Sequence, residues 1–97
     1  MSAAGSDGAI TRIMKIVNEK GLHARASAKF VQLVEKFDAN VRVSRNGESV
    51  GGDSIMGLMM LAAGIGTSIT VTATGPEAKD VIAALATLVS TRFGEDE

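Results

Sequence analysis

Apolar and polar residues alternate in several short stretches of the chain, and such alternation predicts strands with one buried face. Residues 68–74 alternate most regularly, and residues 41–45 show the same pattern. Asn46-Gly47 follows the second stretch and precedes residues 48–50, so we expect a tight hairpin there, because both turn positions require positive φ. Residues 10–17, rich in Ile, Val and Met, predict a further strand.

Other stretches carry their apolar residues three and four positions apart, which is the spacing of one face of a helix. The first predicted helix covers residues 23–37. A short apolar helix should follow from residue 55 to about residue 63, with Ser54 as its N-cap and Gly64 as its stop. The last helix should begin near Gly75-Pro76-Glu77 and end at Gly94.

Taken in order, these elements give a β-α-β-β-α-β-α chain. Thr70, Thr72 and Thr74 would leave one face of the sheet in water, and the hairpin requires antiparallel neighbours. We therefore expect an α/β (α+β) two-layer sandwich, in which three helices cover one face of a four-stranded, mainly antiparallel sheet. The domain should span residues 10–94, between a flexible N-terminal tail (1–9) and an acidic C-terminal end (95–97).

Composition excludes several classes of protein. The chain has 97 residues with 45% hydrophobic and 22% charged residues, as in one ordinary globular domain. A net charge of −1 gives no electrostatic reason to expect nucleic acid as a partner. Without cysteine there are no disulfides and no thiolate zinc sites, and no apolar run reaches the ~20 residues that cross a membrane. We expect a cytoplasmic monomer with no metal, cofactor or membrane insertion.

The start of the first predicted helix carries an uncommon set of residues. The first turn of any helix leaves backbone N–H groups without partners, and most helices place a short polar cap and acids there. Here His23 stands at the cap, followed by Arg25 and Lys29, with no acid before Gln32. The N–H groups, the helix dipole and the guanidinium would converge on an anion such as phosphate, and the imidazole could be the nucleophile that accepts it.

Two segments resemble motifs of a known family. Residues 21–25, Gly-Leu-His-Ala-Arg, followed by Ala-Ser-Ala at residues 26–28, are similar to the active-site signature of the HPr family. These are the histidine-containing phosphocarrier proteins of the bacterial phosphoenolpyruvate:sugar phosphotransferase system. Residues 53–61 resemble the regulatory-serine segment of that family. The resemblance extends from about residue 14 to residue 93 and implies the same order of elements.

The resemblance implies a role for each residue at this helix start. His23 would accept a phosphoryl group on Nδ1 from phospho-Enzyme I and pass it to a histidine of an EIIA-type partner. Arg25 and the backbone N–H groups of Ala24, Arg25 and Ala26 would hold the group. Such a protein is a carrier and not an enzyme with its own turnover. The family usually has proline where this chain has Ala26, which leaves an additional N–H and a less rigid turn.

The second motif suggests regulation and docking. In many bacteria the serine that matches Ser54 is phosphorylated by HPr kinase/phosphorylase, whereas the local sequence alone predicts only an N-cap. Leu58 and Leu61 should pack into the core. A short helix in a two-layer domain cannot bury all its faces, so we expect Ile55, Met56 and Met59 to form an exposed docking surface.

Two alternatives stay open at this point. The protein could belong to a nitrogen-type phosphotransfer chain, which ends on regulators and moves no sugar. It could also be a small α/β interaction module in which His23 lies at the start of a helix but takes no part in phosphoryl transfer.

Overall fold

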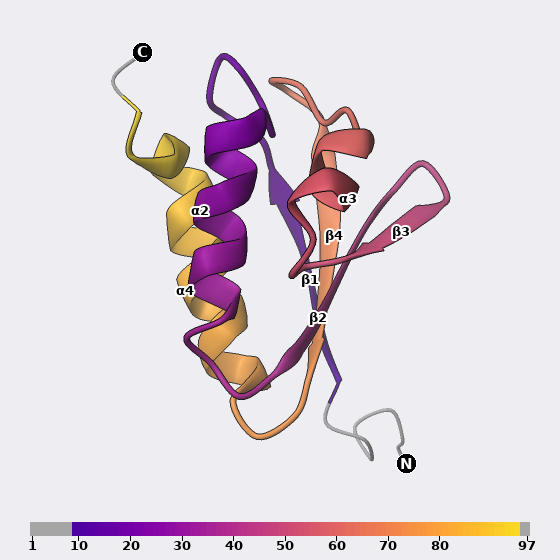
Figure 1. Ribbon diagram of the computed structural model, residues 1–97, viewed down its shortest axis with the longest axis vertical. Helices are drawn as coiled ribbons and strands as arrows, with labels where there is room; N and C mark the ends of the chain where they lie inside the picture. Colours follow the sequence, from indigo (N-terminus) through magenta and orange to yellow (C-terminus); the bar gives the residue numbers. More distant parts are fainter. Residues whose placement is uncertain (1–8, 96–97) are drawn as a thin grey trace.

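The computed structural model describes residues 9–95 and shows the predicted order of strands and helices (Figure 1). The expected tail falls almost wholly outside the described residues, as do Asp96 and Glu97. Among residues 9–95, no helix has the length and apolarity needed to cross a membrane. The elements are β1 (Ile10–Lys15), α2 (Ala24–Val34), β2 (Asn40–Arg45), β3 (Glu48–Gly51), α3 (Ile55–Met60), β4 (Ser68–Thr74), α4 (Ala78–Ser90) and the 3₁₀ turn η1 (Arg92–Gly94).

The four strands form one open sheet in the order β1-β4-β2-β3, and every neighbouring pair is antiparallel. The alternation along β4 has the expected effect, because Ile69, Val71 and Ala73 are fully buried. The threonines between them lie on the other face, where the Thr72 hydroxyl is hydrogen-bonded to that of Thr11 at 3.2 Å. The predicted two-layer fold with a solvated sheet face is therefore confirmed.

The hairpin between β2 and β3 turns at the Asn-Gly pair, as predicted. Asn46 and Gly47 have φ of 54° and 83°, and the two strands pair so that Arg45 faces Glu48. Arg45 also reaches across to α3, where its Nη1 donates to the Leu61 carbonyl at 3.0 Å. The hairpin thereby holds the end of the short helix.

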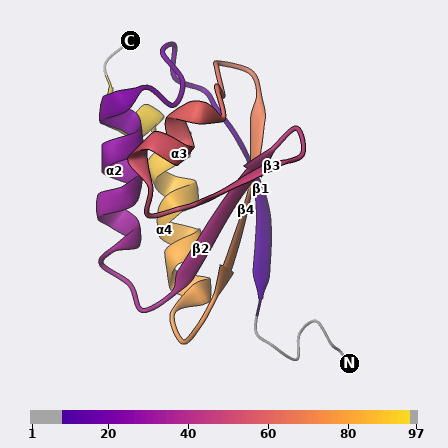
Figure 2. The same cartoon turned by 45° about the vertical axis from the view of Figure 1, so that its right-hand side comes forward.

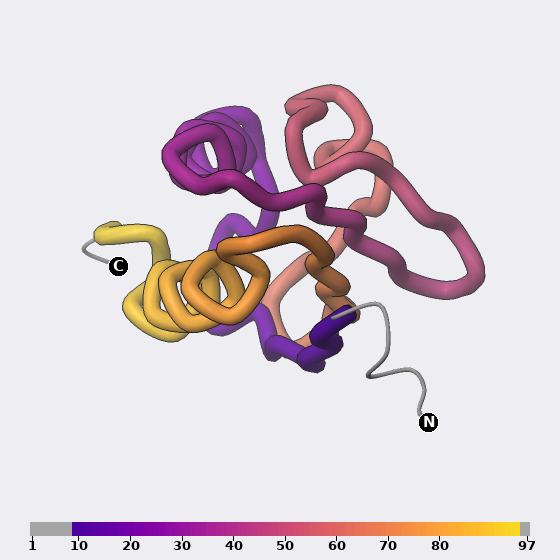
Figure 3. The backbone as a smooth tube through the Cα atoms, turned by 90° about the horizontal axis from the view of Figure 1, so that it is seen from below, coloured from indigo at the N-terminus to yellow at the C-terminus, as the bar shows by residue number. Residues whose placement is uncertain are grey.

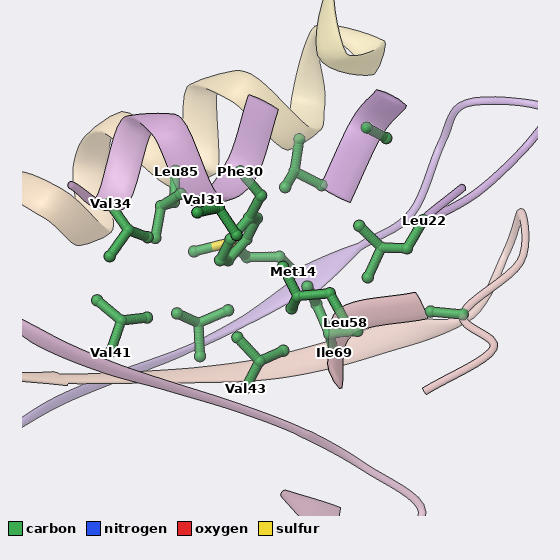
Figure 4. Packing of buried hydrophobic residues seen from close by; sticks show 14 of the residues in the cluster. Met14, Leu22, Phe30, Val31, Val34, Val41, Val43, Leu58, Ile69 and Leu85 are labelled. Atoms are coloured by element: carbon green, nitrogen blue, oxygen red, sulfur yellow. The ribbon is translucent and has the colours of Figure 1, made fainter. Parts of the chain in front are cut away.

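The helices cover one face of the sheet. Helices α2 and α4 run side by side in opposite directions, and α3 packs beside the first half of α2 (Figures 1 and 2). The view from below shows the same arrangement, with both long helices on one side of the strands (Figure 3). Buried side chains fill the space between the layers (Figure 4), among them Met14, Phe30, Val43, Ile69 and Leu85.

The boundaries of the first strand and helix differ slightly from the sequence-based expectation. Strand β1 ends at Lys15, two residues earlier than expected. Lys15 pairs with Ser68, which is the first residue of β4. Helix α2 ends at Val34, and Lys36 and Phe37 continue it only as a tighter turn, with bonds to Leu33 and Val34.

The expected stop of α3 is wrong. The helix ends at Met60, and Ala62 rather than Gly64 takes the left-handed conformation, with φ of 53°. Leu61 N–H and Ala62 N–H close the last turn onto the carbonyls of Leu58 and Met59. The chain must leave the helix early because Ala63, the next residue, is buried and contacts the loop before α2.

Both ends of α4 also differ from the expectation. The helix begins at Ala78 with Glu77 as its N-cap, so Pro76 precedes the helix instead of lying in its first turn. It ends at Ser90, and Gly94 closes the separate turn η1, in which Phe93 already has a left-handed φ of 55°. Phe93 is 1% exposed, so burial of its ring accounts for the turn ahead of the glycine.

Candidate functional site

A short loop connects β1 to α2 and fixes where the helix begins. Gly21 has φ of 64°, which favours glycine, and the N–H of the next residue, Leu22, donates to the Ala63 carbonyl at 3.0 Å. Asn18 is fully buried, and its Nδ2 donates to the Gly21 carbonyl at 2.9 Å. The loop is thus held both by its own asparagine and by the segment that follows α3.

His23 is the N-cap of α2, as predicted. Its backbone is extended, and its carbonyl accepts the first helical hydrogen bond from Ser27 N–H at 2.8 Å. The His23 side chain makes no capping hydrogen bond, and the first turn of the helix contains no acid. The N–H groups of Ala24, Arg25 and Ala26 therefore point out of the helix start without intrahelical acceptors, as an anion site requires.

An open depression lies in front of this helix start and gathers positive charge. Of the predicted site residues it contains His23, Ala24 and Arg25, whereas Ala26 is fully buried beneath them. Lys29 lies one turn further along α2, and its Nζ donates to the Phe93 carbonyl at 2.6 Å. The full lining is Lys20, His23, Ala24, Arg25, Lys29, Gly94 and Glu95.

The end of the chain contributes a site residue that sequence reasoning missed. Turn η1 lies near the start of α2 (Figure 1) and brings Glu95 to the histidine. Oε2 of Glu95 is hydrogen-bonded to Nε2 of His23, and Oε1 accepts from Nδ2 of Asn18 at 3.2 Å. Nothing in the local sequence signals this contact, because the two residues lie 72 positions apart.

The second motif lies on α3, beside the first half of α2 (Figure 2). Ser54 is the N-cap, with its Oγ accepting from Gly57 N–H at 3.0 Å, so the predicted cap is confirmed. Leu58 is fully buried and Leu61 nearly so, as expected. Ile55 and Met59 are each 40% exposed and Met56 is 69% exposed, and the structure adds Met60 and Ile65 to the exposed apolar residues.

No group of three or more metal-ligating side chains comes together within residues 9–95. The chemistry available in the depression therefore consists of one imidazole, three cations and one carboxylate. An imidazole beside free N–H groups and cations is suited to accept and release an anionic group.

Comparison with known proteins gives a consistent result. The family model described as "PTS HPr component phosphorylation site" matches residues 10–91. The phosphocarrier protein HPr of Cupriavidus necator is 50% identical over 88 residues, which is 91% of this chain and 99% of the relative. That of Neisseria meningitidis serogroup A is 46% identical over 84 residues, covering 87% and 94% of the two chains.

Solved structures agree. The crystal structure of HPr-C-His from Thermoanaerobacter tengcongensis superposes with a TM-score of 0.86 at 35% identity, covering 91% of this chain and 99% of the other. A phosphocarrier protein NPr, from Shewanella violacea, is more distant, with 35% identity over 86 residues. The fold, the histidine at the helix start and these similarities lead to one conclusion: the chain belongs to the HPr family, the phosphocarrier proteins of the phosphotransferase system.

Proposed function

We propose that His23 is the residue that carries the phosphoryl group, and that residues 10–94 form the carrier domain. The observation that supports this role is the placement of His23 at a helix start that its own side chain does not cap and whose first turn holds no acid, with Nδ1 lacking a hydrogen-bond partner among residues 9–95. The Arg25 guanidinium and the N–H groups of Ala24 and Arg25 hold the phosphoryl oxygens, whereas Ala26 is buried outside the depression. Besides His23, the described residues of the depression comprise three cations and the Glu95 carboxylate but no second nucleophile, which supports a carrier without turnover of its own.

Its partners follow from this role. Phospho-Enzyme I donates the phosphoryl group and a histidine of an EIIA-type domain accepts it, both in the cytoplasm. A single domain contains the whole depression, so the carrier can act as a monomer. The nitrogen-type alternative has less support, because the relatives of higher identity are HPr proteins.

The function is tested by incubating the purified protein with Enzyme I and phosphoenolpyruvate. Mass spectrometry should show a gain of one phosphoryl group, and the label should be acid-labile, as a phosphorus–nitrogen bond is. Addition of an EIIA domain should remove it. A pure interaction module would gain no mass, whereas a nitrogen-type carrier would be labelled well only by a nitrogen-type Enzyme I.

We also propose that Ile55, Met56 and Met59 form the docking surface for these partners. They are exposed on α3, and α3 packs against the helix that begins at His23. Flexible methionines on a surface can adapt to partners of different shape. One surface could thus serve both the donor and the acceptor.

Met59→Glu should weaken binding to Enzyme I at least about tenfold, because it places a charge in an apolar contact, a loss typical of a central interface residue. Calorimetry or a labelling titration would measure this change. Ile13→Glu is the matched control, since Ile13 is 70% exposed on strand β1 and lies outside the proposed surface. Equal affinity of both variants would remove Met59 from the interface.

We further propose that HPr kinase/phosphorylase modifies Ser54 in a bacterium that has this enzyme. The serine is half-exposed and immediately precedes Ile55 of the docking surface. A phosphate adds a charge of about −1.5 to −2 there. Its repulsion would oppose docking of an acidic partner and so slow the loading of His23.

Two variants separate the cap from the charge. Ser54→Ala should lose about 1 kcal/mol of unfolding free energy with the Gly57 hydrogen bond, and it should take no acid-stable label from the kinase and ATP. Ser54→Asp keeps a good cap but adds charge, so it should retain stability and slow labelling by Enzyme I. If an active kinase leaves the wild type unlabelled, Ser54 is only a cap.

A further inference from the structure

The carboxylate of Glu95 contacts His23 on the ring nitrogen that phosphoryl transfer leaves unused. Oε2 of Glu95 is hydrogen-bonded to Nε2, whereas Nδ1 has no hydrogen-bond partner among residues 9–95. The Glu95 side chain is only 12% exposed and that of His23 is 26% exposed. The two nitrogens of the ring therefore have different environments, one bound to a largely buried acceptor and one open.

Asn18 determines how the carboxylate is held. Its side chain is fully buried, and its Nδ2 donates to the Gly21 carbonyl at 2.9 Å and to Glu95 Oε1 at 3.2 Å. The reversed amide would place Oδ1 against two acceptors, so the amide orientation is fixed by its partners. Oδ1 itself has no partner among the described residues, so the polar contacts of this asparagine side chain come from its donors.

The backbone after α4 places Glu95 at this position. Arg92 and Phe93 have left-handed φ of 61° and 55°, a region that side chains other than glycine rarely adopt. Such residues persist only where their surroundings hold them. Burial of the Phe93 ring and the bond from Lys29 Nζ to the Phe93 carbonyl provide that restraint. The contact between Glu95 and His23 is therefore built into the fold.

We propose that Glu95 is a positioning residue that keeps the proton of His23 on Nε2 and so leaves the lone pair of Nδ1 for phosphorus. A carboxylate has only acceptors, so its bond to Nε2 requires the proton to be there. Carboxylates orient histidines in the same way in hydrolytic triads. The inference rests on the proposed role of His23 as the phosphoryl acceptor.

The same contact acts in both transfer steps. When the Nδ1 lone pair attacks phosphorus, the bond from phosphorus to the donor protein breaks, and its electron pair stays with the donor. The His23 ring then carries positive charge beside the Glu95 carboxylate, which stabilises it. In the onward step the electron pair of the Nδ1–phosphorus bond returns to Nδ1. The ring leaves as neutral imidazole, because its proton has stayed on Nε2.

Two substitutions of Glu95 should differ in a way that a purely structural contact would not produce. Glu95→Ala removes the acceptor and leaves the tautomer free. Glu95→Gln keeps the shape, but the Nδ2 donor of Asn18 turns the amide oxygen toward itself. The glutamine NH₂ then faces Nε2 and drives the proton onto Nδ1. Glu95→Gln, although the more conservative substitution, should therefore slow phosphoryl transfer to His23 more than Glu95→Ala does.

Steady-state labelling by phospho-Enzyme I measures the expected ranking. Glu95→Gln should lower kcat by about 10- to 100-fold, the usual effect of losing the partner that orients a histidine, while KM for the carrier changes little. Glu95→Ala should lower kcat less than Glu95→Gln does. Glu48→Gln, which removes the same charge at the exposed hairpin, should have the kcat of the wild type. A Glu95→Gln protein faster than Glu95→Ala would overturn the proposal.

The tautomer itself can be observed without any partner. In the unphosphorylated wild type, ¹⁵N NMR of the single histidine should show a protonated Nε2 and a bare Nδ1. The Glu95→Gln protein should show the reverse. A wild type with its proton on Nδ1 would refute the inference even if His23 carries the phosphoryl group. An unlabelled wild type would instead refute the proposed function.

Discussion

The His23→Ala protein is expected to take up no phosphoryl group from phospho-Enzyme I under conditions that label the wild type completely. The chain has one histidine, so no other imidazole can replace it. Its side chain makes no capping bond, but it is hydrogen-bonded to the largely buried Glu95 carboxylate, so we expect the variant to stay folded with a loss of about 1–3 kcal/mol of unfolding free energy. Mass spectrometry after incubation with Enzyme I and phosphoenolpyruvate measures the loss.

The Arg25→Ala protein should show a partial loss of labelling, in contrast to the complete loss expected for His23→Ala. The guanidinium lines the depression but supplies no nucleophile, so its removal should slow labelling without abolishing it. A hydrogen bond to a charged group contributes about 1.5–3 kcal/mol, which corresponds to about a 10- to 150-fold slower rate. Acid-labile label on the His23→Ala protein would show that another residue is the acceptor.

Gly21→Ala is expected to cause the largest loss of stability of any small substitution at the site, about 3 kcal/mol or more. A Cβ at this position would lie 2.3 Å from the Ala63 carbonyl oxygen and 2.9 Å from Gly64 Cα. Both are backbone atoms and cannot rotate away. The left-handed φ of 64° adds about 1–2 kcal/mol for a residue other than glycine, and overpacking adds about 1–3 kcal/mol.

Two other glycines supply matched controls in the same urea or guanidinium unfolding experiment. Gly47 has φ of 83° but no atom within 4 Å of an added Cβ. Gly47→Ala therefore measures only the loss of unfolding free energy that the left-handed φ causes, about 1–2 kcal/mol. Gly64 has equally open space and no left-handed φ, so Gly64→Ala should be nearly neutral. If Gly21→Ala cost no more than Gly47→Ala, the close approach of Ala63 would not restrain the loop.

Elements with a regular local pattern could be predicted from the sequence. The alternation of β4 fixes its bounds at Ser68–Thr74, and the Asn46-Gly47 pair locates the hairpin between β2 and β3. The cap at Ser54 and the helix start at His23 also depend on neighbours in the chain, and both were found. These features need no knowledge of the rest of the molecule.

The ends of the helices and the contact of Glu95 with His23 could not be predicted, because distant segments decide them. Helix α3 ends at Met60, ahead of Gly64, since the carbonyl of Ala63 must accept the hydrogen bond from Leu22 N–H. Glu95 looked like part of a charged end, yet it reaches His23 because Phe93 turns the chain into the core. The hydrophobic periodicity of the sequence does not predict a contact between residues as far apart as Glu95 and His23.

The separation of 72 positions between His23 and Glu95 also has a consequence for molecules that are only partly folded. Because closing so long a loop depends on the β1–β4 pairing and on the docking of α4, we expect this contact to form late in folding and to open early. A carrier whose last turn has come loose still displays helix α2 with its histidine. It should then transfer slowly while most of its hydrogen bonds remain intact. In this chain the rate of phosphoryl transfer should therefore detect loosening of the last turn more sensitively than a measurement of helical content.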